Sequence, residues 1–472
     1  MNTHHLSRRD FFHRAGAGFG MLALQDLIAR GATTNPLAPK TPHFPGKAKS
    51  VIWLFMNGGV SHVDTWDYKP ELQKRDGKPL DGFDPKTGFF PAQVGPLMGS
   101  PFKWAQHGQS GTWGSDLFPT LTQHVDKMAF IHSCWTKSNN HSPALFMMNT
   151  GETRMGFPSA GAWVTYGLGS ASDDLPAFIV MSDPKDRGLP KGNASNWTAG
   201  FLPSVYQGTW LKPKGEPIDN LKRLPNLSEQ RQREQLDLLA RLNRASLADS
   251  TIESELAARV DSFELAYRMQ TAAPETFDLK GEPEHVRKLY GLDQPHCSHM
   301  AAQCLTARRL VERGTRFVQI YSGGMENQLS WDCHSDLIGN HSGFAREVDQ
   351  PFAALLADLA QRGMLEDTLV VCAGEFGRLP ISQKGAKPGR DHNPHAFTAW
   401  LAGGGVKGGA HYGETDDIGF KAAVDKVSVH DFHATILHAL GIDHERLIFK
   451  FQGLDQRLSG VEPARVVKEV FA

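Results

Sequence analysis

Residues 342–377 read "SGFAREVDQPFAALLADLAQRGMLEDTLVVCAGEFG", a stretch that joins a helix-forming segment directly to a short apolar run. Apolar residues recur at helical spacing up to Leu359, and Gly363 is placed to end the helix. The run "TLVVCA" that follows predicts a buried strand, which ends in Gly374 and Glu375. A helix leading straight into a buried strand is typical of an α/β protein.

The same pattern recurs on both sides of this stretch. A second helix is predicted at residues 429–442, with Gly441 near its end. Because strands and helices alternate, the sequence predicts an α/β fold with a mostly parallel central sheet and helices on both faces. The other buried strands are predicted within residues 50–59, 128–135, 177–183, 316–324 and 396–405.

Three segments differ from this core. Residues 1–34 contain "SRRDFF" before a Gly/Ala-rich stretch and resemble a twin-arginine signal, although a basic amphipathic helix would have similar features. Residues 35–48 are Pro-rich and are expected to be a linker. Residues 228–271 are rich in helix formers and predict a helical insertion in a single domain spanning residues 49–472. The signal implies export by the twin-arginine machinery to the periplasm or beyond.

The composition limits the classes of partner. The chain has 472 residues, 40% hydrophobic and 21% charged, with a formal net charge of −1 and no long basic block. A nucleic-acid-binding surface is therefore not indicated. No stretch beyond the N-terminus approaches 18 continuous apolar residues, so no transmembrane helix is expected in the mature protein. The five cysteines form no C-x-x-C pair, and neither a disulfide scaffold nor a cysteine-rich zinc site is indicated.

Polar residues gather just after the predicted strands. Ligands of open α/β sheets bind at the carboxyl ends of the strands, so these positions are candidates for a site. Histidine mixed with carboxylate favours Zn or Mn over Ca or Mg, and one or two such ions are expected. The candidates are His62 and Asp64, Ser138 and His141, Asp332 and His334, Glu375, and finally Arg390, Asp391, His392 and His395 within "GRDHNPH" (389–395).

Each candidate also has a purely structural explanation. A D-x-H pair such as Asp332 and His334 occurs by chance, although residues two apart in an extended chain project to the same side. Asp391 and His395 converge only if the chain turns at Pro394; otherwise the motif is a polar turn between buried elements. Arg390 suits an oxyanion, but a salt bridge to a nearby carboxylate would explain it equally well.

Several of these segments together resemble a known family. In chain order they are "GGVSHVDTWDYKP", "NNHSPALFMMNTG", "WDCHSDL", "GEFGRLP", "GRDHNPHAFTAWLAGGGVKGG" and "HDFHATILHALGID". They are similar to the bacterial DUF1501 family, whose members carry twin-arginine signals and have no well-established activity. That family distantly resembles the alkaline phosphatase and sulfatase superfamily, which implies an alkaline-phosphatase-like core.

The resemblance implies roles for individual residues. Asp64 matches the first carboxylate of the superfamily by position, and Glu375-Phe376 stands where many sulfatases have Asp-His, so His395 or His334 would replace the missing histidine. No formylglycine motif is present, which leaves Ser138, Thr136 or a metal-bound water as nucleophile. His141 would act beside it, and Arg390 would bind the substrate.

Two functions follow from this reading. One is an exported metal-dependent hydrolase of phosphate or sulfate esters, with an anionic ester as substrate, for example one derived from a polysaccharide. The alternative is a catalytically silent, metal-containing protein on the same scaffold that binds a polysaccharide or a protein.

Overall fold

The computed structural model describes residues 35–213, 215–218, 223, 226–247, 263–270, 274–325 and 327–472. Its core is a nine-stranded sheet in the order β13-β5-β12-β9-β1-β8-β6-β7, with β16 paired to β5. All six predicted strands are present in this sheet. They are β1 (Ser50–Met56), β5 (Met128–Trp135), β6 (Phe178–Met181), β8 (Phe317–Ser322), β9 (Thr368–Ala373) and β12 (Phe397–Ala402), joined by β7 (Thr209–Leu211), β13 (His411–Tyr412) and β16 (Val427–Ser428).

The sheet is mostly parallel, as predicted, and β12 is the exception among the described strands. It runs antiparallel to both β5 and β9, with Phe397 opposite Cys134 and Trp400 opposite Cys372. The other pairings of the sheet are parallel. Consequently the residues just before β12 lie at the edge where β5, β9, β1 and β8 end.

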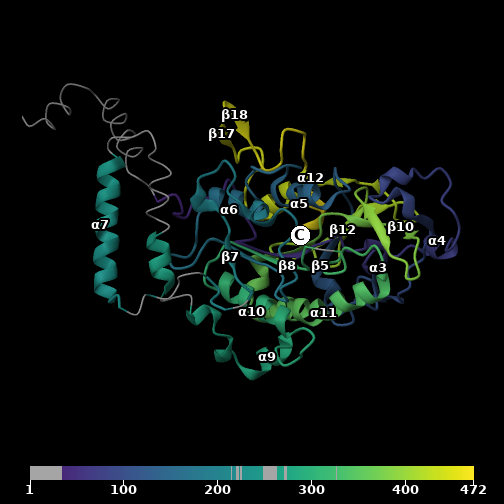
Figure 1. Cartoon of the computed structure of the whole chain (residues 1–472), viewed down its shortest axis with the longest axis horizontal. Helices are drawn as coiled ribbons and strands as arrows, with labels where there is room; N and C mark the ends of the chain where they lie inside the picture. Colours follow the sequence, from purple (N-terminus) through teal and green to yellow (C-terminus); the bar gives the residue numbers. More distant parts are fainter. Residues whose placement is uncertain are drawn as a thin grey trace, which may run out of the picture.

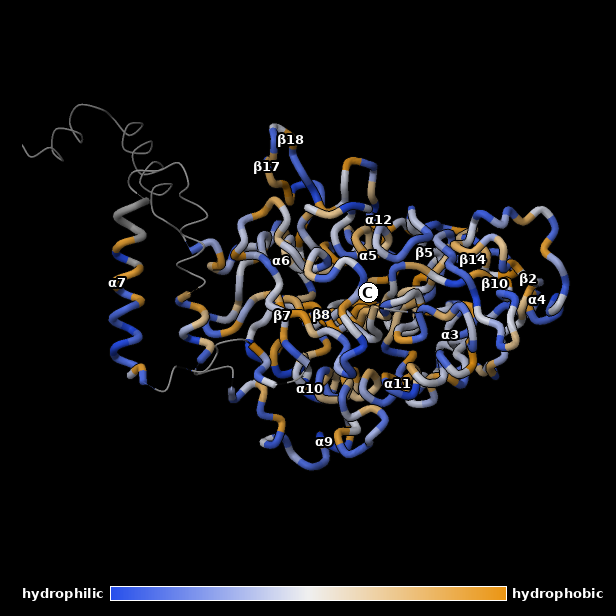
Figure 2. The backbone as a smooth tube through the Cα atoms, in the orientation of Figure 1, coloured by the Kyte–Doolittle hydropathy of each residue, from blue (hydrophilic) through white to orange (hydrophobic). Residues whose placement is uncertain are grey.

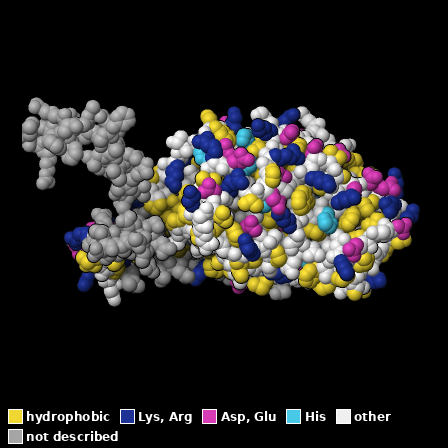
Figure 3. Space-filling model, turned by 90° about the horizontal axis from the view of Figure 1, so that it is seen from above, with side chains coloured by type: hydrophobic (Ala, Val, Ile, Leu, Met, Phe, Trp, Pro, Cys, Tyr) yellow, Lys and Arg dark blue, Asp and Glu magenta, His cyan; other side chains and the backbone are white. Residues whose placement is uncertain are grey.

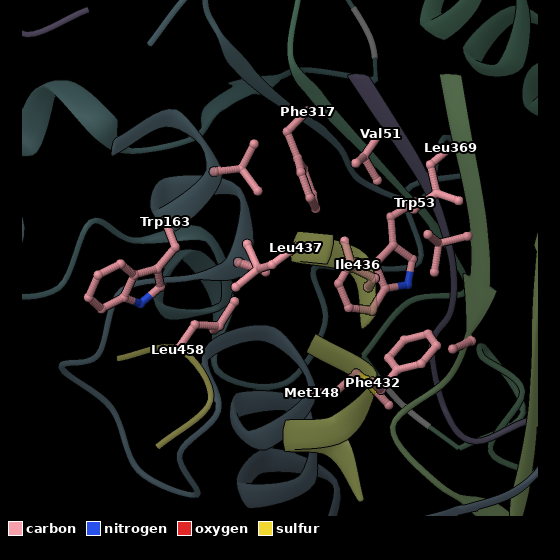
Figure 4. Packing of buried hydrophobic residues seen from close by; sticks show 14 of the residues in the cluster. Val51, Trp53, Met148, Trp163, Phe317, Leu369, Phe432, Ile436, Leu437 and Leu458 are labelled. Atoms are coloured by element: carbon pink, nitrogen blue, oxygen red, sulfur yellow. The ribbon is translucent and has the colours of Figure 1, made fainter. Parts of the chain in front are cut away.

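Strand β1 explains why both faces of the sheet are covered. All seven of its residues are buried, and alternate side chains enter two different apolar clusters. Val51 and Trp53 face the cluster that contains Leu437 (Figure 4), and Phe55 belongs to the same cluster. Ile52, Leu54 and Met56 face the second cluster, on the opposite side of the sheet. Truncating a buried aromatic such as Trp53 to alanine costs about 3–5 kcal/mol of stability.

Helices lie on both faces, as predicted. The cluster around Trp53 is covered by α5 (His141–Thr150), α6 (Ala160–Leu168) and α12 (Val429–Ala439), and the opposite cluster by α9 (Glu284–Tyr290), α10 (Ser298–Glu312) and α11 (Leu337–Gln361). Figure 1 shows these two sets on opposite sides of the strands, and Figure 2 shows the most hydrophobic segments concentrated between them.

The ends of two helices follow from local hydrogen bonds. The helix predicted from residue 342 begins earlier, at Leu337, because the Asp336 side chain accepts a hydrogen bond from Gly339 N and caps the first turn. Helix α12 begins with a reciprocal capping box between Ser428 and Asp431. Gly363 follows α11 in a left-handed conformation, φ 69°, as expected of a residue that ends a helix.

A smaller sheet places the "GRDHNPH" segment. Strand β11 (Arg390–Asn393) pairs antiparallel with β10 (Gly377–Gln383), and β10 pairs with β2 (Val94–Leu97). The first part of the motif is therefore a strand, and its Pro394-His395 step leads into β12. The remaining described elements are α3 (His62–Thr65), α4 (Pro70–Lys74), α7 (Glu229–Leu247), β3 (Trp104–His107), β4 (Thr112–Ser115), β14 (Glu414–Thr415), β15 (Ala422–Val424), β17 (Phe449–Phe451), β18 (Leu454–Gln456) and short 3-10 helices.

The structure describes the three segments that differ in composition, residues 1–34, 35–48 and 228–271, to different extents. The predicted signal at residues 1–34 lies outside the described residues. The Pro-rich segment after it is held against the body, because Lys40 N donates to Leu168 O and Phe44 N donates to Gly441 O. Within the predicted insertion, α7 and residues 263–270 are helical, and the stretch between them lies outside the described residues.

The surface and the cysteines agree with the composition. In Figure 3, acidic and basic side chains are interspersed over the visible face. All five cysteines are buried and free. Among the described helices, none has the length and apolar character that crossing a bilayer requires.

Candidate metal centre

Four residues from three separate segments meet at the carboxyl edge of the main sheet. His141 is the first residue of α5, just beyond β5; Asp332 and His334 follow β8; His392 lies in β11. One ligand atom from each lies within 4.8 Å of the others. His141, Asp332 and His392 are buried, and His334 is nearly so. This cluster contains three nitrogen donors and one carboxylate.

Two glycines allow the segments to come this close. Gly58, which follows β1 with φ 109°, lies so near the Asp332 backbone that a Cβ would overlap Asp332 N. A Cβ at Gly389 would likewise overlap the backbone of His334 and Ser335. Arg390 N then donates to Cys333 O at 2.9 Å and joins β11 to the loop that carries Asp332. A larger residue at position 58 would push the end of β1 away from Asp332, and one at position 389 would push β11 away from His334.

His141 is oriented by a buried carboxylate. Its Nδ1 lies 2.7 Å from Glu375 Oε1, and Gly58 N donates to both oxygens of that carboxylate, to Oε1 at 3.0 Å and to Oε2 at 3.2 Å. An ionised carboxylate only accepts hydrogen bonds, so His141 Nδ1 carries the proton and Nε2 presents a lone pair. Glu375, predicted as a metal ligand, therefore contacts the histidine instead of joining the four-residue cluster.

His334 and His392 are fixed in the same way. His334 Nδ1 lies 2.7 Å from Gln383 Oε1, and His392 Nδ1 lies 2.6 Å from the backbone oxygen of Asn139. Both partners are acceptors, so both rings carry their proton on Nδ1 and turn Nε2 toward Asp332. This is the arrangement found around metal-binding histidines, where the second ring nitrogen donates to an oxygen.

The three Nε2 atoms converge on one carboxylate. Asp332 Oδ1 lies 2.9 Å from His334 Nε2 and 3.2 Å from His392 Nε2, while its Oδ2 lies 3.0 Å from His141 Nε2. The Nε2 atoms of His334 and His392 are 2.9 Å apart. His141 Nε2 and Asp332 Oδ2 are buried and make no hydrogen bond of acceptable geometry, despite their proximity. Lone pairs thus face lone pairs, which is stable only with a cation or an added proton between them.

Burial and charge act together on the cluster. Burial opposes ionisation of Asp332, but Arg378 and the three histidines hold the pKa of its carboxyl well below the usual range. Burial also lowers the pKa of His392, and the charge of His141 lowers it further. For His141 burial acts downward, yet Asp332 and Glu375 raise its pKa overall. In the metal-free protein, His141 is therefore where a proton can replace the cation.

Asp64, Arg390 and His62 lie elsewhere. Asp64 is fully buried and accepts from Arg390 Nε at 2.6 Å, from Arg390 Nη2 at 3.1 Å and from Ser61 Oγ at 2.5 Å. The Arg390 guanidinium has no exposed surface and also donates to the backbone at Met98, so the expected substrate contact gives way to a salt bridge. His62 Nε2 bonds Gly419 O at 2.8 Å. None of the three belongs to the four-residue cluster.

The remaining candidates lie beside the cluster or away from it. Asp391 Oδ1 is 3.7 Å from His334 Nδ1, and its Oδ2 accepts from Phe90 N at 2.7 Å. His395 is exposed and packs against Phe420, with ring centroids 5.9 Å apart. His334, and not His395, thus joins the cluster, which was one of the two replacements considered for the histidine absent at Phe376.

The two candidate hydroxyls differ in environment. Ser138 Oγ bonds only the backbone of Asn140, donating to its oxygen at 3.3 Å and accepting from its nitrogen at 3.1 Å. Thr136 Oγ1 is buried without a hydrogen-bond partner, and Thr136 N donates to Pro394 O at 2.8 Å. Lys137, between them, pairs with Glu462 at the surface, 2.9 Å away.

Sequence reasoning missed the partners that orient the histidines. Gln383 and the backbone oxygen of Asn139 each hold one Nδ1, and a strap of residues 87–90 packs on two histidines of the cluster. Asn139 Nδ2 donates to Thr87 O and Gly88 O, and the Phe90 ring lies 4.7 Å from His334. The proximity of Asn139 to His141 in sequence was a usable signal; Gln383 and the strap gave none.

The cluster fits a transition-metal ion better than a hard one. Three imidazoles with one carboxylate suit Zn, Mn or Fe, whereas Ca and Mg sites are dominated by oxygen ligands. The orphaned atoms His141 Nε2 and Asp332 Oδ2 supply two of the four donors. The described residues thus contain a buried site that could hold a metal ion.

Comparison with known proteins agrees with the predicted family. Residues 48–471 match the family model "Protein of unknown function (DUF1501)", and the chain belongs to this family. No match was found among the curated protein sequences.

Similar solved structures include three bacterial proteins. A lipoteichoic acid synthase from Listeria monocytogenes is 11% identical, with a TM-score of 0.32, 90% of this chain covered and 78% of the other. A sulfatase from Pseudoalteromonas sp. is 11% identical, with a TM-score of 0.34 and coverages of 90% and 71%. An alkaline phosphatase from the Antarctic bacterium TAB5 is 10% identical, with a TM-score of 0.33 and coverages of 79% and 96%. At these identities and TM-scores the likeness assigns neither a superfamily nor any site residue to this chain.

Proposed function

We propose that this protein is an exported metal-dependent hydrolase of phosphate or sulfate esters. The observation that supports the proposal is the convergence of His141, His334 and His392 Nε2 on Asp332, with each ring held by an oxygen at Nδ1. Such an arrangement is built for a metal ion, because neutral imidazoles with inward lone pairs repel one another otherwise. One cluster of this size suits one ion.

The protein's own residues would prepare the site. A divalent ion held there supplies Lewis acidity and makes a bound water or hydroxyl more acidic. Glu375, Gln383 and Asn139 would keep the histidines aligned, and Arg378 would keep Asp332 ionised. In the overall reaction a water oxygen bonds to phosphorus or sulfur, the ester bond to the leaving oxygen breaks, and the leaving group gains a proton.

The nucleophile and the cationic group remain parts of the proposal. Thr136 Oγ1 has no partner to give up, whereas Ser138 must break two local hydrogen bonds. Arg378 and Arg390 are both fully buried and committed to carboxylates. Lys137, whose exposed pair with Glu462 is weakly held, is the cation that could turn to an anionic ester.

A second function has one observation in its favour. All four donors come from the protein and are largely buried, which is typical of structural metal sites; catalytic sites keep a position open. A catalytically silent, metal-containing binding protein for a polysaccharide or a protein would need no open position.

The decisive experiment combines metal content with turnover. The purified full-length protein is assayed by mass spectrometry for metal and with aryl phosphate and aryl sulfate for hydrolysis. His392→Ala should lose the metal and the activity, whereas His395→Ala, from the same motif but exposed, should keep both. Bound metal without turnover on either ester supports the binding protein, and absence of metal in the wild type contradicts both functions.

Further variants test the nucleophile and export. If Thr136 attacks the ester, Thr136→Val abolishes turnover with metal retained, and Ser138→Ala leaves it nearly intact. Export by the twin-arginine route predicts that replacing Arg8 and Arg9 with lysine leaves the protein in the cytoplasm. Unchanged periplasmic recovery of that variant would contradict the route, with no bearing on the chemistry.

A further inference from the structure

A cavity lies at the edge of the main sheet opposite to the candidate metal centre. Its volume is about 530 Å³, and it is lined where β1, β8 and β9 begin, by residues that include Ser50, Thr315, Arg316 and Thr368. The metal cluster lies beyond the ends of the same strands, which are six or seven residues long. At about 3.3 Å per residue, roughly 20 Å of rigid sheet separates the two regions.

The charges around this cavity leave one cation unmatched. Lys49 pairs with Asp367 at 2.8 Å. Arg362 pairs with Asp358 at 2.7 Å and with Glu312 at 3.5 Å. Arg316 has no carboxylate within salt-bridge distance among the described residues.

The Arg316 guanidinium is only partly satisfied. Its Nη1 donates to Lys49 O at 3.0 Å, while Nε is buried without a hydrogen-bond partner. Burial lowers the pKa of Arg316, and no neighbouring carboxylate offsets that effect. A half-buried arginine is normally paired, because removing the charge from water is costly. Its Nε and Nη2 edge is the one that receives two oxygens of a carboxylate or phosphate side by side.

A neighbouring hydroxyl is orphaned as well. Thr315 is fully buried and lines the cavity, and its Oγ1 has no hydrogen-bond partner. Ala171, Val311 and Met364 supply apolar wall on the same cavity. A cationic fork, an unpartnered hydroxyl and an apolar wall are the features of a site for a small amphipathic anion.

We propose that this cavity binds a small molecule through an oxyanion, carboxylate or phosphate, held by the unpaired guanidinium of Arg316. The apolar wall would contact the remainder of the ligand. The site is independent of the metal centre and of the proposed hydrolase activity, since it shares no residue with either. Its affinity should fall with rising salt, as expected for a charge partly open to solvent.

The test is calorimetric titration with inorganic phosphate, sulfate and acetate, in both the wild type and the His392→Ala background. The latter removes a histidine of the metal centre, so that binding there does not interfere. Arg316→Gln should weaken binding of at least one of these anions by about tenfold or more. Arg316→Lys keeps the charge but loses the bidentate fork, so its affinity for the anion should lie between those of the wild type and Arg316→Gln.

Arg313→Gln is the matched control, because Arg313 is near in sequence and does not line the cavity. It should bind as the wild type does. Preference for acetate over phosphate would identify a carboxylate ligand, and the reverse a phosphate or sulfate ligand. The proposal is overturned if none of the three anions binds in the His392→Ala background, or if Arg316→Gln binds them unchanged.

Discussion

Two buried carboxylates near the same edge of the sheet have opposite surroundings. Asp64 is paired through both oxygens with the Arg390 guanidinium and also accepts from Ser61. Asp332 accepts a hydrogen bond from Arg378 Nη2, and its other neighbours are imidazole nitrogens whose lone pairs point inward. The first centre is complete as it stands. The second has more acceptors than donors.

This difference separates a structural salt bridge from a candidate metal site. A bidentate arginine matches a carboxylate in charge and in hydrogen-bond geometry, so nothing more is needed at Asp64. Three neutral histidines with Nδ1 committed to oxygens cannot satisfy Asp332 without a metal ion or an added proton. We therefore expect changes at Asp332 to alter metal binding, and changes at Asp64 to alter stability.

The largest expected effect is that of Asp332→Asn. Asparagine keeps the shape but removes the charge that balances a divalent ion, and it can turn an N–H toward the histidines. Metal content should fall from about one ion per chain to a small fraction, and ester hydrolysis should fall with it by at least about a hundredfold. Metal analysis after gel filtration is the measurement. A variant that retains stoichiometric metal would place the ion elsewhere.

Asp64→Asn should unfold the protein more easily and leave the metal in place. The change strands the buried Arg390 charge, which costs about 3–5 kcal/mol. Urea denaturation measures the loss, and metal analysis of the folded fraction measures retention. Asp367→Asn is the control, because its pair with Lys49 is exposed and should contribute about 0–1 kcal/mol. Loss of metal without loss of stability would reverse the roles of the two carboxylates.

How far the sequence could predict this contrast depends on the kind of information required. The strands were found because continuous apolar runs such as that of β1 are typical of sheets buried on both faces. Asp332, His334 and His392 were found because they follow strands or lie in a motif with histidine and carboxylate. These are local signals, and they were sufficient for the fold class and for naming three of the four clustered residues, whose role as metal ligands stays a prediction.

The roles of the individual residues depend on contacts between parts of the chain that are far apart in sequence. Asp64 and Arg390 are 326 residues apart, and no spacing rule indicates that one neutralises the other. Glu375 has the chemistry of a ligand, but its distance from His141 Nδ1 makes it an orienting partner. His141 was expected beside the nucleophile because of the family resemblance. Its place in the cluster depends on the antiparallel direction of β12, which brings β11 beside α5 and which an apolar run does not indicate.

Glu375→Gln tests whether orientation of His141 matters to the metal. Glutamine can still accept a hydrogen bond from Nδ1 but lacks the charge that raises the basicity of the ring. Metal affinity should fall by about 10–100-fold, with folding largely retained. Competition with a chelator of known affinity gives the value. Gln383→Glu is the complementary variant, because it adds a carboxylate at His334 Nδ1 and should tighten binding.

The smallest expected effect concerns the histidine beside the Asp64 centre. His341 donates from Nδ1 to Asn340 at 3.1 Å and accepts from Ser61 N at 3.1 Å through Nε2, so it is neutral and has no lone pair to offer a metal. Burial lowers its pKa to about 3; the charge of Asp64 acts in the other direction, and those of Arg378 and Arg390 lower the pKa further. In the unfolded chain His341 binds a proton near pH 6.5, whereas in the folded chain it binds one only near pH 3. Stability should therefore fall as the pH drops through this window.

For this single site the loss between pH 7 and pH 5 is about 2 kcal/mol. His341→Gln, although less stable at neutral pH, should show an acid-induced loss smaller by that amount in urea denaturation at the two pH values. Metal content should be unchanged, because the ring lies outside the cluster. An unchanged acid dependence would mean that His341 is already protonated in the folded protein, and its lone pair could then not accept from Ser61. The Asp64 centre would then lack the complete hydrogen bonding described above, and the four residues of the candidate metal centre, which do not include His341, would be unaffected.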